Sequence, residues 1–224
     1  IADLTQERLK SGIPPQEIAV LVQTNAELFP IYDVLRAREI PVILMGKSDL
    51  LTHPIVSQAL TILRSLETVS DTALLHALAC ECFGCHPADI ARVIAAARTV
   101  KKSSRDLLLD LEKSAMAFTD RTSLTRARDL LLDFHQKQDS RSVVDTVEHI
   151  LRESGLSMGG EKADPLDLAA IEAFFRYVKQ RCLDHPFLTL CEFMSDLNLY
   201  ADEGYSQLRL TYQMPHLVTE GVQL

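Results

Sequence analysis

Several features that would assign a protein to a functional class are missing from this sequence. No apolar run approaches the roughly 18 residues that a membrane-spanning helix needs, so we expect no membrane segment. The chain starts with IADLTQERLKSG, which is polar and amphipathic and lacks the apolar core of a secretory signal. It also lacks an initiator methionine, so we expect the front of the chain to be cut. No internal repeat of fixed period is present either.

An excess of basic residues is missing as well. The chain has 23 lysines and arginines against 31 aspartates and glutamates, which gives a formal net charge of −8. This balance argues against a dedicated nucleic-acid-binding domain, but it is compatible with a local basic stripe on an acidic body. The five cysteines are an odd number in a chain without a secretory signal, which indicates a reduced, cytoplasmic protein.

The common catalytic and phosphate-binding motifs are also missing. The sequence contains no G-x-S-x-G, no HExxH and no G-x-x-x-x-G-K-[ST], and its seven histidines show no i, i+4 pairing. The stretch GGEKADP (159–165) has glycines and a lysine, but it lies between two expected helices. A phosphate cradle requires a strand, a glycine loop and a helix in that order, so we interpret this stretch as a loop.

The sequence does contain an ordinary globular composition, with 47% hydrophobic and 24% charged residues. Residues 1–48 alternate helix and strand. IAVLVQ (18–23) and IPVILMG (40–46) are apolar, β-branched runs typical of buried parallel strands. A helix is expected between them, over TNAELFPIYDVLRARE (24–39), and the three elements together predict one crossover of a parallel sheet.

Residues 49–206 follow helical patterns, and residues 207–224 return to strand with QLRLTYQM and HLVTEGVQL. The expected helices lie near 53–69, 71–80, 87–99, 103–118, 121–138, 142–155, 164–183 and 187–204. In the helix at 164–183, the spacing predicts a buried face formed by Leu168, Ile171, Phe174, Phe175, Val178 and Cys182. We therefore expect a mainly α fold with a small α/β portion, in which a helical block interrupts the α/β part as a domain insertion would.

The stretch CECFGCH has four side chains that can bind a metal ion, namely Cys80, Cys82, Cys85 and His86. Thiolates and an imidazole can form a tetrahedral zinc site, but a second well-spaced pair is missing. The other interpretation is a helix end, a turn at the glycine and a new helix, in which reduced cysteines pack as small apolar side chains. The spacing favours the turn over zinc.

One basic stretch stands out, ARTVKKSSR (97–105). Its cations are Arg98, Lys101, Lys102 and Arg105, and further arginines follow at Arg121, Arg126 and Arg128. A cluster of this kind near a turn is what contact with a DNA backbone requires. The alternative is a solvated helix end whose cations complement the C-terminal dipole, and composition alone favours that alternative.

The junction VLVQTNAE places Thr24 and Asn25 between an expected strand and an expected helix. Ligands of open parallel sheets gather at the carboxyl ends of the strands. The small side chains of Thr24 and Asn25 beside a helix N-terminus suit a phosphate oxygen. They also suit an ordinary N-cap of the helix, so both interpretations stand.

Four stretches, in the same order, resemble UvrD-like superfamily 1 DNA helicases. Residues 18–46 resemble a segment that usually reads IAVLxRTNAQ, then a helix, then a GIPxxxxGG-like strand. LLTHPIVSQALTILRSL (50–66) resembles the next helix of the family, typically FFxxPEVxDLLALLRLL. LACECFGCHPADIARV (78–93) resembles SPFFGLSxxDL of the relatives nearest to the RecB and AddA nuclease-helicases. EGVQL (220–224) resembles the opening of motif V, GVQLMTxHxSKGLE.

The resemblance implies an architecture and a function. Residues 1–48 would be part of the second RecA-like (P-loop NTPase-type) domain, called 2A, and residues 207–224 would be its return strands, truncated at the start of motif V. Residues 49–206 would be the helical 2B subdomain inserted in 2A. In this family, 2A and a first RecA-like domain hydrolyse ATP and step along single-stranded DNA during repair or recombination. The 2B part touches duplex DNA and regulates unwinding.

The resemblance also implies what this stretch of chain leaves to its parent. The P-loop, the DExx motif, the rest of motif V and motif VI are not in it, so we expect ATP and Mg to bind the intact parent, and this chain alone to have no ATPase activity. Thr24 and Asn25 match the family's RTNAQ and are carried over as single-strand contacts, whereas the arginine of that motif is Gln23 here. The Gly-Ile-Gly duplex-binding turn of UvrD-type members has a single glycine here, Gly84.

The expected partners are therefore single-stranded and junction duplex DNA and the rest of the helicase chain, with further protein partners and no membrane. Two other hypotheses remain open from the residues. The acidic helical block can be a protein-interaction module, which the net charge of −8 favours over bare DNA binding. The third is a small zinc-binding domain at residues 80–86.

Overall fold

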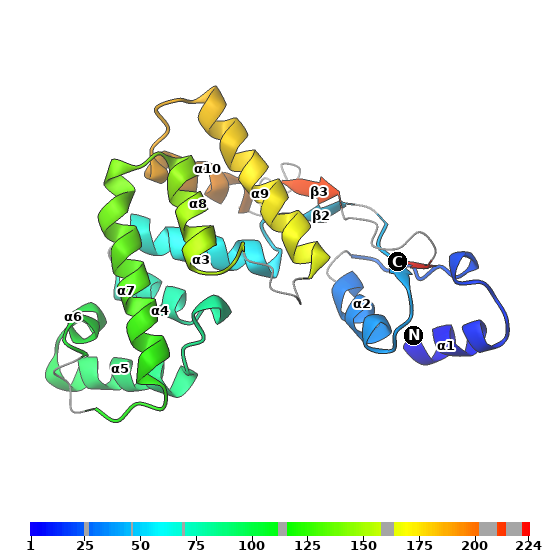
Figure 1. Cartoon of the computed structure of the whole chain (residues 1–224), viewed down its shortest axis with the longest axis horizontal. Coiled ribbons are helices and arrows are strands. Elements are labelled where there is room, and N and C mark those ends of the chain that lie inside the picture. Colours follow the sequence, from blue (N-terminus) through cyan, green and yellow to red (C-terminus); the bar gives the residue numbers. More distant parts are fainter. Residues whose placement is uncertain are drawn as a thin grey trace. The chain divides into compact units, whose positions relative to one another are not determined.

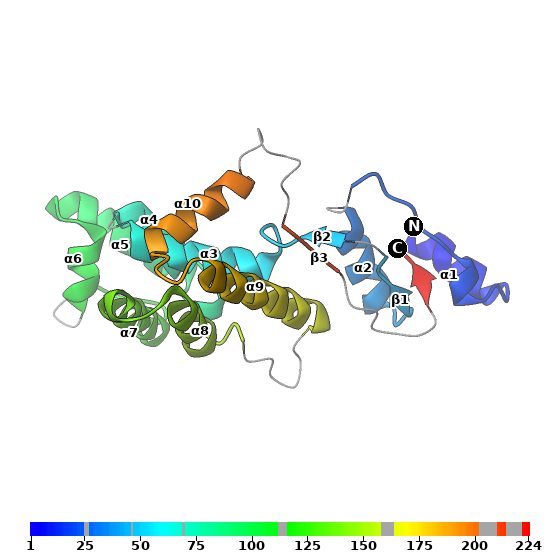
Figure 2. The ribbon, with the colours of Figure 1, turned by 90° about the horizontal axis from the view of Figure 1, so that it is seen from above.

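The computed structural model describes residues 1–24, 27–45, 47–68, 70–111, 116–157, 164–201, 210–213 and 221–224. They belong to two units, drawn in Figure 1 and Figure 2. The α/β unit combines Ile1–Asp49 with Thr211–Leu224, and the helical unit is Leu50–Leu210. The expectation of a mainly α fold with a small α/β portion is confirmed. None of the described helices is long and apolar enough to cross a membrane.

The α/β unit is built on a parallel pair of strands from opposite ends of the chain. Its elements are α1 (Ala2–Lys10), a 3₁₀ turn (Pro15–Glu17), α2 (Leu28–Ala37), β1 (Val42–Ile43), β2 (Lys47–Asp49), β3 (Thr211–Gln213) and β4 (Val222–Gln223). β1 pairs with β4 in parallel, with Val42 opposite Val222, and β2 pairs with β3 in antiparallel orientation. The buried apolar side chains of this unit include Leu28, Tyr32, Leu35, Ile40, Val42, Leu44, Val222 and Leu224.

The prediction of a buried strand over residues 18–23 is wrong. Ala19 forms one isolated parallel bridge with Gln223, and the amide of Val20 donates to the carbonyl of Gln223 over 2.8 Å. Leu21 is 93% exposed. A strand that is buried on both faces needs cover on both sides, and among the described residues only β4 pairs with this stretch. The apolar run therefore led to a prediction of more burial than residues 18–23 have.

The strand expected over residues 40–46 is present but shorter and buried on one face. Ile40, Val42 and Leu44 are buried, whereas Met45 is exposed. Alternating side chains of a strand point to opposite faces, so this burial pattern marks one face as the packed one. The sequence pattern located the strand but did not show that its second face is open.

The cap expected for α2 is also wrong at Thr24. The N-cap is Glu27, and no side chain accepts a hydrogen bond in that position. The carbonyl of Thr24 instead accepts a hydrogen bond from the amide of Glu27 over 3.1 Å, so the chain makes a turn before it enters the helix. Asn25, the other predicted cap, lies outside the described residues.

The helical unit is organised around one apolar helix, α3. Its described elements are α3 (Pro54–Glu67), α4 (Asp71–Leu78), α5 (Pro87–Val100), α6 (Ser104–Leu109), α7 (Arg121–Lys137), α8 (Val143–Glu153), α9 (Pro165–Asp184), α10 (Leu190–Ala201) and 3₁₀ turns at Glu81–Phe83 and Gln138–Ser140. α3 packs against α4, α7, α8, α9 and α10 (Figure 1). It does so through Val56, Ala59, Leu60, Ile62, Leu63 and Leu66, which are all buried. Apolar residues at this spacing cover enough of a helix surface to meet several neighbours.

Two helices of this unit differ from their predicted form. The helix expected over 103–118 ends at Leu109, with Asp110 as C-cap. In α9, Leu168 is 42% exposed, whereas Ile171, Phe174 and Val178 are buried as predicted. At 100° per residue, Leu168 is turned well away from the centre of the buried face, so the predicted stripe was wider than the packed one.

Carboxylates of one helix cap the beginning of another. Asp71, in the first turn of α4, accepts hydrogen bonds from the amides of Ser104 and Arg105 at the start of α6, over 2.5 and 3.4 Å. The first amides of a helix have no partner within it, and a carboxylate there also complements the positive end of the helix dipole. Asp71 therefore ties the start of α6 to α4.

Asp89 forms a second tie of this kind and is fully buried. Its carboxylate accepts hydrogen bonds from the amides of Thr119 and Asp120, over 2.8 and 2.7 Å, and from the guanidinium of Arg92 over 2.5 Å. Burial alone would raise the pKa of Asp89, but the hydrogen bonds from these groups outweigh burial and hold the pKa at about 2. Asp120 in turn caps α7 by accepting from the amide of Ser123.

Replacing Asp89 by asparagine tests this tie. Asparagine offers fewer acceptor positions and no charge to the same three donors, so we expect Asp89→Asn to lower the free energy of unfolding at pH 7 by about 1 to 3 kcal/mol. Because the folded-state pKa lies below the ordinary 3.8, the contribution of Asp89 is present above pH 4 and is lost as the pH falls towards 2. Urea unfolding between pH 2 and 7 should show the two proteins converging at the acid end.

The control is Asp139→Asn, which changes an exposed aspartate in the same unit. We expect it to change the free energy of unfolding by less than about 0.5 kcal/mol. A gap between wild type and Asp89→Asn that stays constant down to pH 2 would contradict the assignment of the acid sensitivity to Asp89.

Candidate nucleic-acid interface

The predicted basic stretch lies at the turn between α5 and α6. Lys101 is the C-cap of α5 and has a left-handed backbone conformation, with φ of 53°. The amide of Lys102 donates to the carbonyl of Ala97 over 3.1 Å and closes the helix end. Glycine usually occupies such a position, because a side chain costs about 1 kcal/mol there. The turn thus keeps a lysine where the backbone alone would favour glycine.

Three of the four cations in this stretch face solvent. Arg98, Lys101 and Lys102 are exposed, and within the described part of the chain their side chains form no hydrogen bond or ion pair. Their position at the C-terminal end of α5 complements the helix dipole, as the alternative interpretation of the stretch requires. The same position leaves three positive groups close together and open to an anionic chain. We call Arg98, Lys101 and Lys102 the basic turn.

Arg105, the fourth predicted cation, has a different environment. It lies in the first turn of α6 and is half-buried. Its side chain lines a recess whose other walls come from α3, α4 and α7. The structure therefore places Arg105 beside a recess, whereas the three cations of the basic turn are exposed.

The arginines that follow in the sequence are largely used within the fold. The guanidinium of Arg121 donates to the carbonyl of Leu111 over 3.2 Å and lies over the ring of Phe118. Arg128 is buried and donates to the carbonyl of Leu108 and to the carboxylate of the next residue. Only Arg126 of these three is exposed without such a contact among the described residues. Arg121 and Arg128 thus add little to an external basic surface.

The second predicted contact region lies in the α/β unit. Thr24 is exposed and follows the extended stretch that bridges to β4, beyond its carboxyl end. Its hydroxyl is therefore accessible, and its role as a single-strand contact stays a prediction. Asn25 cannot be placed, since it lies outside the described residues.

The cysteine stretch forms the expected turn between two helices. α4 ends at Leu78, Gly84 has a positive φ of 64°, and α5 begins at Pro87, so this interpretation of the sequence is confirmed. Cys80 is buried, and burial raises the pKa of Cys85 to about 11, which keeps that thiol protonated at neutral pH. In the part of the chain that the structure describes, no three His, Cys, Asp or Glu side chains are grouped to hold a metal ion.

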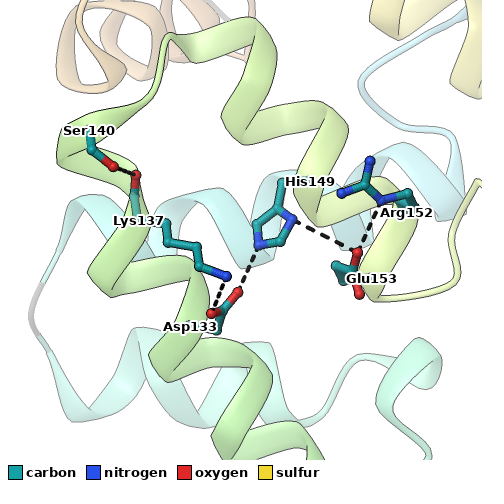
Figure 3. Close-up of polar contacts among 6 residues, drawn as sticks. All are labelled: Asp133, Lys137, Ser140, His149, Arg152 and Glu153. Atoms are coloured by element: carbon teal, nitrogen blue, oxygen red, sulfur yellow. Dashed lines mark hydrogen bonds and ion pairs between the residues drawn. The ribbon is translucent and has the colours of Figure 1, made fainter.

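One polar cluster was not predicted from the sequence. Figure 3 shows His149 of α8 between carboxylates of two helices. Its Nε2 lies 2.7 Å from Asp133 of α7, and its Nδ1 lies 4.0 Å from Glu153, one turn further along α8. Lys137 approaches the other oxygen of Asp133 to 2.5 Å. The signal that could have revealed this cluster is a histidine on the apolar face of α8, among valines and isoleucine.

This histidine cluster ties α7 to α8. His149 is 7% exposed, and its ring meets the edge of Phe134 with the ring centroids 5.3 Å apart. Lys137 first and His149 second lower the pKa of Asp133, so Asp133 is ionised at neutral pH. An aspartate–histidine pair can act as a general base when it lies beside a nucleophile. No serine, threonine or cysteine side chain among the described residues makes a hydrogen bond to this ring, so the geometry supports a structural tie.

The sequence matches no protein-family model and no curated protein with which it was compared. A proposal for the function therefore rests on the residues of this chain and their arrangement.

Replacing Asp133 by alanine tests the histidine cluster. It leaves the buried Nε2–H of His149 without an acceptor, so we expect the free energy of unfolding to fall by about 1 to 3 kcal/mol. The matched control is Glu153→Ala, which removes a carboxylate 4.0 Å from Nδ1, beyond hydrogen-bond distance, and should cost less than about 1 kcal/mol. Denaturant unfolding at pH 7 measures both, and equal costs would contradict the assigned pairing.

Proposed function

We propose that this chain is a segment of a UvrD-like superfamily 1 DNA helicase, covering part of the 2A domain and the inserted 2B subdomain. The observation that carries the proposal is the pairing of β1 with β4. It joins residues that precede the helical unit in the sequence to residues that follow it, and both belong to one unit. This is the organisation that the four resembling stretches imply.

The RecA-like nature of the α/β unit is part of the proposal. Support comes from the order of its parallel elements, since β4 forms hydrogen bonds on both sides. Val20 donates to Gln223, and on the other side Val222 donates to Pro41 and Met45 donates to Leu224. The stretch around Ala19 and β1 thus flank β4, and the connection through α2 links two parallel elements of one sheet. Such a connection is the building block of α/β nucleotide-binding sheets.

In this proposal the chain positions DNA and regulates the motor, and its parent supplies ATP hydrolysis. The basic turn contacts phosphates of the nucleic-acid backbone. Backbone contact through lysine and arginine is independent of base sequence and weakens steeply with salt. The acidic remainder of the chain, which sets the net charge of −8, disfavours such contact elsewhere, and Thr24 and Asn25 are the second proposed contact.

Neutralising both lysines of the basic turn tests the proposal. Each phosphate contact contributes about 0.7 to the slope of log K against log salt on single strands. We therefore expect Lys101→Ala/Lys102→Ala to weaken binding of an oligothymidylate at low salt and to reduce that slope by about 1.4. Fluorescence anisotropy over a series of sodium chloride concentrations measures both quantities on the same chain.

The control for this pair is Arg176→Ala/Lys179→Ala on α9, which removes the same charge from the same unit. Arg176 pairs with Glu172, and Lys179 lies over the ring of Phe175, so neither belongs to the basic turn. We expect the slope of the control to stay within about 0.5 of the wild-type slope. An equal loss in both variants would show a general charge effect, and no loss at Lys101 and Lys102 would reject the basic turn as the contact.

A further inference from the structure

A recess in the helical unit is lined by α3, α4, α6, α7 and the residues between α3 and α4. Its apolar lining consists of Leu66, Leu74, Leu108, Leu109, Leu131 and Leu132. We call it the leucine recess. Together with the solvent at its mouth it has a volume of about 580 Å³. Leu66, Leu108 and Leu131 form its buried floor, whereas Leu109 is half-exposed at the edge.

The ionisable side chains that line the leucine recess are engaged with other described residues, with one exception. Asp71 accepts from two amides of α6, and Arg128 donates to the carbonyl of Leu108. Nδ1 of His135 lies 3.1 Å from Nε2, the side-chain amide nitrogen, of Gln138. These groups therefore need no ligand to satisfy them.

The exception is the guanidinium of Arg105. It is half-buried, and its side chain has no hydrogen bond or ion pair with any described residue. A guanidinium carries five N–H donors and stays charged at all physiological pH values. A half-buried guanidinium beside an apolar floor selects a ligand that couples an apolar group to an anion.

We propose that the leucine recess is a docking site for a partner segment in which large apolar side chains are followed directly by acidic ones. An apolar side chain of the partner would cover the leucine floor, and its neighbouring carboxylate would pair with Arg105. Nucleic acid fits the recess less well, because its described lining contains no Phe, Tyr or Trp ring on which an unpaired base would stack, and the imidazole of His135 is already paired with Gln138.

This site is separate from the proposed DNA contact. It uses Arg105 and the leucines, whereas the DNA proposal uses Arg98, Lys101 and Lys102. Either proposal can therefore fail while the other stands. Variants of Arg105 and of the basic turn separate the two proposals.

The test uses the full chain and a fluorescein-labelled probe peptide, Gly-Ser-Asp-Leu-Leu-Asp-Glu-Gly-Ser, in anisotropy titrations. Two matched peptides accompany it. In the first, alanine replaces both leucines. In the second, asparagine replaces each aspartate and glutamine replaces the glutamate. We expect each change to weaken binding about tenfold, because the first removes the apolar cover and the second the charged partner of Arg105.

Variants of the chain then locate the site. Arg105→Glu should weaken the probe peptide about tenfold, and Leu109→Gln should weaken it about fivefold while changing a half-exposed residue. Arg98→Glu makes the same charge change outside the recess and should leave peptide binding within about twofold of the wild type. Thermal unfolding checks that all three variants fold.

The proposal is overturned if the folded wild-type chain does not bind the probe peptide, or if it binds the alanine peptide equally well. Equal weakening by Arg98→Glu and Arg105→Glu would overturn it as well. An oligothymidylate can compete with the peptide, and Arg105→Glu can weaken the oligothymidylate as much as it weakens the peptide. If both occur, the recess belongs to the DNA contact and the docking proposal is rejected. If Lys101→Ala/Lys102→Ala lowers only DNA binding, the two sites are separate as proposed.

Discussion

The parallel pairing of Val42 with Val222 is the interaction on which the organisation of the chain depends. It holds together strands that lie far apart in the sequence, and closing so long a stretch of chain costs conformational entropy that the pairing must offset. The hydrogen bonds of β4 to Pro41 and Ile43 on one side and to Ile18 and Val20 on the other do this together with the burial of Val222 and Leu224. The helical unit is inserted between β2 and β3, which pair with each other in a second two-stranded sheet of the α/β unit.

Within the helical unit, buried and half-buried carboxylates hold neighbouring helices together. Asp71 and Asp89 each fix the beginning of a helix that follows later in the sequence, and Asp133 joins α7 to α8 through His149. Because Asp71 fixes the start of α6 and the amide of Lys102 closes α5, the basic turn is held at both sides. Its three cations are therefore presented on a defined backbone, while Arg105, one turn further, lines the leucine recess.

Much of the helical unit could be predicted because apolar residues recur at helical spacing and because serine, aspartate and proline mark the starts, as at Ser142 of α8 and Asp164 of α9. The exposure of residues 18–23 could not be predicted, because an apolar run does not tell how many layers cover it, and Leu21 is exposed. The basic turn was recognisable from its composition. The separate environment of Arg105 and the pairing of His149 with Asp133 depend on which helices meet, and local spacing carries no such information.

The most direct test of the central claim, that this segment contacts DNA through the turn between α5 and α6, is hydrogen–deuterium exchange of the chain with and without an oligothymidylate at low salt. We expect slower amide exchange in residues 98–103, with the protection removed by added salt, and unchanged exchange in α9. Unchanged exchange at the turn under conditions in which the oligonucleotide is bound, or protection confined to α9, would contradict it.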